Sequence, residues 1–157
     1  MPLRTQLWIG VLLAWLVLLG GCRDASPGGG ASGAPHGLDP ARIARGADVY
    51  RQHCAACHGE RAQGTFAWER PGADGKYPAP PLDGSAHAWH HPTAQLKQTI
   101  QDGTLKLGGS MPAWKGKLSE ADTEAVIAYF QSRWPAEIYQ AWADIDRRSR
   151  MEAAKKR

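Results

Sequence analysis

The sequence predicts an all-α domain, because three segments combine apolar residues at helical spacing with signals that start and stop helices. The first covers residues 39–52 and the second covers residues 92–102. The third begins at Ser119 and is closed by Pro135. A further helical stretch within residues 136–157 is expected to pack back on this body through Ile138, Trp142 and Ile145.

The first segment has the clearest helix signals. Asp39 is a good N-cap residue, and Pro40 occupies the first helical position. Gly46 stands in the middle, where glycine costs up to about 1 kcal/mol relative to alanine. A close crossing by another helix would offset that cost. The apolar face is formed by Ile43, Ala47, Tyr50 and Cys54.

The other two segments also have recognisable boundaries. Residues 92–102 should turn Leu96 and Ile100 inward and stop at Gly103. The segment that starts at Ser119 opens with Ser-Glu-Ala-Asp, which is close to a capping box. Its apolar residues are Val126, Ile127, Tyr129 and Phe130.

The informative motif is Cys54-Ala55-Ala56-Cys57-His58, since CxxCH is the attachment signature of a c-type haem. Cysteines at this spacing reach both vinyl groups of the haem, and the adjacent histidine becomes an axial iron ligand. A thioredoxin-like CxxC would need a βαβ setting, which the flanking sequence does not offer. A zinc site would need a second pair of ligands at suitable spacing. The motif occurs once, which predicts one haem c.

These features resemble the class I cytochromes c over residues 39–134. In that family a glycine lies eight residues, and an aromatic residue four residues, before the first haem cysteine, as Gly46 and Tyr50 do here. The resemblance implies the cytochrome c fold, in which N- and C-terminal helices cross around one covalently bound haem. Tyr129 would be the aromatic residue at the crossing. The cytochrome c domain is then expected over residues 39–135, followed by a helical extension with a basic tail.

The resemblance also implies a second iron ligand. The segment from Gly108 to Trp114 resembles the distal loop of the family, in which a methionine sulfur binds the iron opposite the histidine; here that residue is Met111. A thioether is a soft, neutral ligand that raises the reduction potential. The alternative for Met111 is an ordinary core methionine. Further candidates for the haem pocket are Trp89, Leu105, Leu107 and Trp114.

The segment from Pro80 to Gly84 resembles the loop whose backbone carbonyl accepts the Nδ1 proton of the proximal histidine. Alignment on Leu82 and Gly84 assigns this carbonyl to Pro80, with Pro81 as the alternative. Such a bond would orient the histidine ring and increase its donor strength.

Three histidines, His87, His90 and His91, gather beside Trp89. They could bind copper or compete for the haem iron. The favoured interpretation is that they are loop residues near the haem propionates.

The N-terminus indicates export. The stretch Leu7–Leu19 is apolar throughout, but its thirteen residues are too few to cross a bilayer core, which needs roughly 20 in helical form. The sequence Leu-Gly-Gly-Cys that ends at Cys22 resembles a bacterial lipobox, so residues 1–21 should be removed and Cys22 acylated. The alternatives are an uncleaved anchor helix and a plain secretory signal. All of these place the domain on the periplasmic side of a membrane, and Arg23 slightly favours the outer membrane.

Composition separates a tether from the body. Residues 22–38 are rich in Gly, Ser, Ala and Pro, which predicts a flexible tether with a span on the order of 20 Å. Residues 23–146 carry 12 basic and 14 acidic residues, whereas residues 147–157 carry six basic and one acidic. This tail could lie against anionic lipid or an acidic partner. A solvated, partly frayed helix end is favoured, and nucleic acid is not an expected partner in this compartment.

Two protein ligands would leave no open position on the iron. The sequence therefore predicts an electron carrier rather than an enzyme, serving a respiratory redox donor and acceptor that it does not name. One alternative is a haem-based sensor or peroxidase-like protein with a displaceable Met111. Another is a tethered cytochrome subunit of a larger oxidase or dehydrogenase complex.

Overall fold

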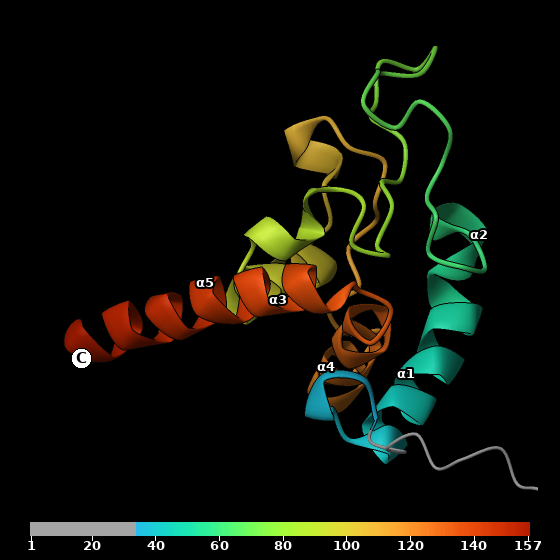
Figure 1. Ribbon diagram of the computed structural model, residues 1–157. Helices are drawn as coiled ribbons and strands as arrows, with labels where there is room; N and C mark the ends of the chain where they lie inside the picture. The colour runs from blue at the N-terminus through green and yellow to red at the C-terminus, as the bar shows by residue number, and fades with distance from the viewer. Residues whose placement is uncertain (1–33) are drawn as a thin grey trace, which may run out of the picture. The chain divides into compact units, whose positions relative to one another are not determined.

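A computed structural model describes residues 34–157. The expected signal peptide, residues 1–21, and Cys22 lie outside this range. Within it the regular elements are helices, which confirms the all-α prediction (Figure 1). No helix of this part is long and apolar enough to cross a membrane. The α-helices are α1 (Pro40–His53), α2 (Ala55–His58), α3 (Thr93–Asp102), α4 (Glu120–Gln131) and α5 (Ala136–Lys155), and short 3-10 turns occupy Pro35–Gly37, His87–His90 and Leu105–Leu107.

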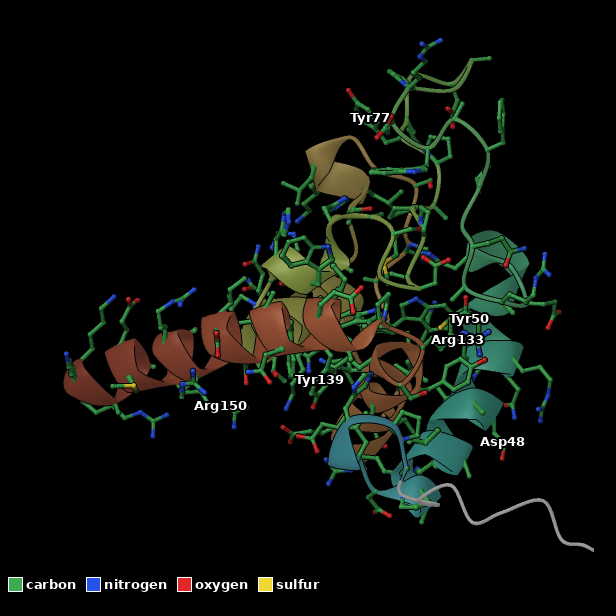
Figure 2. The ribbon with its side chains drawn as sticks, in the orientation of Figure 1. Asp48, Tyr50, Tyr77, Arg133, Tyr139 and Arg150 are labelled. Carbon is green, nitrogen blue, oxygen red and sulfur yellow. The ribbon has the colours of Figure 1, made fainter. Side chains whose placement is uncertain are left out.

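The crossing of α1 and α4 is the central packing contact. A Cβ atom on Gly46 would lie 2.6 Å from the carbonyl carbon of Ala125 and 2.8 Å from the Cβ of Tyr129, so only glycine allows this approach. Tyr129 packs beside Tyr50 of α1, with ring centroids 5.0 Å apart. The expected crossing of two helices at Gly46 is thus confirmed, together with its aromatic residues. Figure 2 shows Tyr50 on α1.

The helix ends follow the sequence signals closely. The Asp39 side chain accepts a hydrogen bond from the Ala41 N–H at 3.0 Å at the start of α1. The Ser119 hydroxyl accepts from the Asp122 N–H at 3.0 Å at the start of α4. Gly103, with φ of 69°, ends α3 as predicted. Helix α4 stops at Gln131, a few residues earlier than Pro135 suggested.

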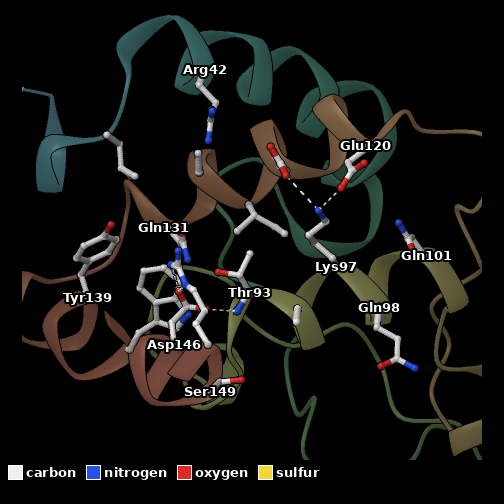
Figure 3. Close-up of a pocket in the computed structure, with 17 residues that line it drawn as sticks. Arg42, Thr93, Lys97, Gln98, Gln101, Glu120, Gln131, Tyr139, Asp146 and Ser149 are labelled. Atoms are coloured by element: carbon white, nitrogen blue, oxygen red, sulfur yellow. Dashed lines mark hydrogen bonds and ion pairs between the residues drawn. The ribbon is translucent and has the colours of Figure 1, made fainter. Parts of the chain in front are cut away.

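Helix α5 lies within the helical extension expected over residues 136–157. It continues to Lys155, so the basic tail is helical where a partly frayed end was the favoured expectation. Its first half packs on the body, because the Trp142 indole donates to the carbonyl of His91 at 3.1 Å. The buried Asp146 accepts from the Thr93 N–H at 2.7 Å and so caps α3 (Figure 3). Both bonds join segments about fifty residues apart.

Two groups of buried side chains form the core. One lies where α3, α4 and α5 meet and includes Leu96, with the half-buried Ile100 packed against it, as predicted. The other lies at the crossing of α1 and α4 and reaches the residues that follow α2. The first group consists of Ala88, Leu96, Ile127, Phe130, Trp134 and Trp142, and the second of Val49, Tyr50, Ala55, Ala62 and Val126.

Candidate functional site

The CxxCH motif lies at the end of α1. Cys54 ends this helix by donating its N–H to the Tyr50 carbonyl at 2.8 Å, and α2 then carries Cys57 and His58. Both cysteines are free thiols, Cys57 exposed and Cys54 partly buried. Burial and the neighbouring Cys57 raise the pKa of Cys54 to about 11, so this thiol is protonated at neutral pH. The helix crossing therefore fixes the start of the motif.

The His58 ring is held in one orientation. It is 8% exposed, and its Nδ1 lies 2.8 Å from the carbonyl oxygen of Pro80. A carbonyl only accepts, so Nδ1 carries the proton and Nε2 keeps a lone pair. Burial lowers the pKa of His58, and the bond to Pro80 opposes this only in part. A neutral imidazole with Nε2 available is the form that binds a metal.

The loop around Pro80 is fastened on both sides. The Leu82 N–H donates to the Ala62 carbonyl at 2.7 Å, and the Trp134 indole donates to the Leu82 carbonyl at 2.9 Å. A Cβ on Gly64, whose φ is 69°, would lie 2.6 Å from the carbonyl carbon of Pro80. Sequence reasoning did not find Gly64 or Trp134 as supports of this loop. Gly64 lies in a long loop that has no hydrophobic periodicity, and the Trp134 indole is 52 residues away in sequence from the carbonyl to which it donates.

Besides packing at the helix crossing, Tyr50 forms a hydrogen bond beside the CxxCH motif. Its hydroxyl donates to the Gly59 carbonyl at 2.8 Å, directly after His58. Burial raises the pKa of Tyr50, so the phenol keeps the proton that it donates. This bond ties the motif back to the crossing of α1 and α4.

The backbone of Met111 is held by two hydrogen bonds to one residue, Thr104. Its N–H donates to the Thr104 hydroxyl at 3.1 Å, and its carbonyl accepts from the Thr104 N–H at 2.9 Å. The Trp114 ring packs against His53 at the end of α1, with centroids 5.2 Å apart. The side chain of Met111 is half-buried. Of the other pocket candidates, Leu105 and Leu107 are 53% and 82% exposed, and Trp89 packs on the core beside α5.

The loop that follows the motif also contacts the Met111 segment. The Tyr77 N–H donates to the Gly108 carbonyl at 2.9 Å, and the Ser110 hydroxyl donates to the Tyr77 carbonyl at 3.0 Å. Tyr77 itself is 48% exposed (Figure 2). The segments that carry His58 and Met111 are thus connected through the backbone.

The three histidines pack mainly with aromatic rings. His87 lies 5.4 Å from Trp68 and 5.7 Å from His91, and His90 lies 3.8 Å from Trp89, between ring centroids. Burial and the two neighbouring histidines lower the pKa of His87. Within residues 34–157 no three His, Cys, Asp or Glu side chains are arranged to hold a metal ion.

The donor set fits a covalently attached haem. Two free thiols stand at CxxCH spacing, and a buried neutral imidazole follows them. A family model described as cytochrome c oxidase, cbb3-type, subunit III matches residues 41–130. The chain belongs to this cytochrome c family. Its members carry haem c, which agrees with the predicted cofactor.

Three relatives of the chain are named as subunits of a cbb3-type cytochrome c oxidase or of a cytochrome bc1 complex. The chain is 37% identical over 91 residues to the cbb3-type cytochrome c oxidase subunit CcoP of Azospirillum sp. (strain B510), covering 58% of this chain and 28% of the relative. It is 33% identical over 108 residues to CcoP of Rhodobacter capsulatus (64% and 32%). It is also 33% identical over 97 residues to the cytochrome bc1 complex cytochrome c subunit of Corynebacterium diphtheriae (61% and 29%).

The chain thus spans about a third or less of the length of these relatives. No solved structure matches it significantly. Helix α5 lies beyond the residues that the family model matches.

Proposed function

We propose that this cytochrome c domain transfers single electrons through one haem c, attached to Cys54 and Cys57 and ligated by His58 and Met111. The observation that carries the proposal is the bond between His58 Nδ1 and the Pro80 carbonyl, 2.8 Å long. It leaves the lone pair of Nε2, on a buried and neutral ring, available to bind the iron. The domain is an electron-transfer protein and needs no catalytic residue of its own.

The bound haem would supply a one-electron iron couple. The chain's own residues would keep both ligands in place in either oxidation state. Pro80 fixes the imidazole of His58, and Thr104 fixes the backbone of Met111 on both sides. The thioether of Met111 would favour the reduced iron. With both iron positions filled by protein ligands, small ligands and peroxide would find no open site.

The relatives favour a subunit over an independent carrier. All three are named as subunits of respiratory oxidase or bc1 complexes. We therefore propose that the domain works while associated with such a complex, which is the second alternative that the sequence left open. Purification in mild detergent tests this. A subunit should remain with its complex through size-exclusion chromatography, whereas an independent carrier should elute alone.

The proposed location is the periplasmic face of a membrane, with lipid on Cys22 and the tether of residues 22–38, whose last turn, Pro35–Gly37, packs on the body through His36. The apolar stretch before Cys22 and the composition after it support this. Mass spectrometry of the N-terminal peptide from membranes tests it. The proposal requires a peptide that begins at acylated Cys22, and a peptide that retains residues 1–21 would contradict it.

Attachment of haem is tested by mass after denaturation. The wild-type chain should retain the mass of one haem and stain for covalent haem on a denaturing gel. Cys54→Ser and Cys57→Ser should each weaken attachment, and the double variant should abolish it. His53→Ala, beside the motif, is the matched control and should keep the haem mass. Loss of haem from the wild-type chain on denaturation would contradict the proposal.

A further inference from the structure

The second half of α5 is an exposed basic helix end. Asp146 is the last buried residue of α5, and every residue beyond it is exposed except the half-buried Ser149. In Figure 1 these turns extend past the other helices of the domain. Residues 147–157, here called the basic end, carry six basic residues and one acidic residue. Most of these charges have no partner in the described part of the chain, since Arg147 and Arg150 alone form ion pairs there.

The charge of the basic end surrounds the helix axis. At 100° per residue, Arg148 and Lys155 point the same way to within about 20°, whereas Lys156, Arg150 and Arg147 lie in other directions around the axis. Met151 is the one large apolar residue among residues 147–157, and it is 57% exposed. Specific protein interfaces need a desolvated apolar or aromatic centre, which this segment does not offer. A planar anionic surface needs positive charge alone.

The N-terminal end of the described chain lies beside the opposite end of α5. The ring of His36 stacks on Tyr139 in the early turns of α5, with centroids 4.1 Å apart, and its Nε2 lies 3.0 Å from the Trp134 carbonyl. From Tyr139 to Lys155 the helix rises about 24 Å at 1.5 Å per residue. Two membrane attachments that reach the body at points this far apart would restrict the orientation of the domain, whereas one flexible tether would not.

We propose that the basic end of α5 binds the anionic phospholipid headgroups of the membrane and, with the lipid on Cys22, orients the cytochrome domain at the surface. The inference rests on the proposed attachment at Cys22. Helix α5 is rigid enough to transmit this contact, because Trp142 and Asp146 fasten its first half to the body. Figure 2 shows Arg150 on α5 beyond the labelled Tyr139.

Hydrogen–deuterium exchange on the full-length haem protein tests the contact. The protein is reconstituted into nanodiscs of phosphatidylcholine alone or of phosphatidylcholine mixed with phosphatidylglycerol. Amides of residues 147–155 should exchange about threefold more slowly, or slower still, on the anionic discs, and high salt should remove the difference. Equal exchange on both discs at low salt would overturn the proposal.

A charge variant and a matched control separate local from overall charge. The variant changes Arg148, Lys155, Lys156 and Arg157 to Gln, and none of these forms an ion pair within residues 34–157. The control changes four exposed residues outside the α-helices to Gln: Arg61, Arg70, Lys76 and Lys106. The charge variant should lose the protection while the control keeps it. Equal loss of protection in both variants would overturn the proposal. It would also be overturned if the charge variant kept its protection on the anionic discs but no longer co-purified with its complex, because the basic end would then contact an acidic protein.

Flotation with phosphatidylcholine vesicles tests the lipid on Cys22 separately, so that failure of this anchor can be told apart from failure of the contact made by the basic end. A lipid anchor should hold the chain on neutral vesicles at high salt. If that flotation fails, the anchor is wrong, and the basic end is then tested by salt-sensitive flotation with the anionic vesicles alone.

Discussion

The indole Nε1 of Trp134 donates to the carbonyl oxygen of Leu82 at 2.9 Å, two residues beyond the Pro80 carbonyl that orients His58. Trp134 is 3% exposed and belongs to the core between α3, α4 and α5. The position of His58 is thus connected to the packing of the C-terminal helices. This connection is mechanical, because the indole is hydrogen-bonded to the loop that orients the histidine.

Trp134→Phe should lower the free energy of unfolding by about 1–3 kcal/mol, since the carbonyl of the half-buried Leu82 loses its donor. It should also raise the reduction potential, because a looser Pro80 carbonyl makes His58 a weaker donor to the iron. Urea unfolding and a redox titration measure the two effects.

The matched control is Trp142→Phe. Its indole also donates to a loop carbonyl, that of His91 at 3.1 Å, but away from His58. The Trp142→Phe variant should lose a comparable free energy of unfolding without a change in reduction potential. Equal shifts of potential in both variants would argue that general loosening of the core, and not the Pro80 loop, is responsible.

Gly46→Ala should destabilise the protein by about 2–4 kcal/mol, although alanine is the better helix former. The added methyl group would press on the backbone of Ala125 and on Tyr129, and backbone cannot move aside as a side chain can. Thermal unfolding checks this. Ala44→Gly, at an exposed position of the same helix, should cost only about 1 kcal/mol through helix propensity. A neutral or stabilising Gly46→Ala would mean that the helices do not cross this closely.

Asp146 predicts a pH dependence. Burial alone would raise the pKa of Asp146, but hydrogen bonds from the Thr93 N–H and from Arg150 lower it overall. A carboxyl group whose folded pKa is lowered stabilises the fold above its unfolded pKa of about 3.9, and loses this contribution as the pH falls through the folded pKa. Asp146→Asn should therefore be destabilising by about 1–3 kcal/mol at neutral pH.

The difference between wild type and Asp146→Asn should shrink below about pH 4. Urea unfolding at a series of pH values measures it. Asp144→Asn, which removes an exposed ion pair with Arg147 and affects an exposed hydrogen bond from Gln140, should change stability by less than about 1 kcal/mol at any pH. A pH-independent difference for Asp146→Asn would show that its charge is not what stabilises α5 on α3.

The sequence predicted the elements that depend on local signals. Caps at Asp39 and Ser119 and the glycine at the crossing are read from neighbours in the chain, and the structure agrees with them. The supports of the site were not predicted, because they act between distant segments. Trp134 and Gly64 contact the Pro80 loop across 52 and 16 residues, and no periodicity marks either. A helical extension within residues 136–157 was expected, but the regular helix through its basic end was not, since charged residues without an apolar face do not indicate a helix.

Met111 predicts a spectroscopic result. Met111→Ala should lower the reduction potential and allow carbon monoxide to bind the reduced protein, because the soft sixth ligand is lost. Met151→Ala, at an exposed site on α5, is the matched control and should leave both unchanged. If Met111→Ala behaves like the wild-type protein, another side chain is the ligand, and the histidines of residues 87–91 are the next to be substituted.

The visible spectrum of the wild-type haem protein, reduced and oxidised, with carbon monoxide added to the reduced form, tests the central claim most directly. An electron-transfer domain with His58 and Met111 on the iron should give sharp reduced bands and the weak far-red band of methionine on ferric iron. Carbon monoxide should change nothing. Ready binding of carbon monoxide, with the far-red band absent, would contradict this account and favour a sensor or peroxidase-like protein with an open iron site.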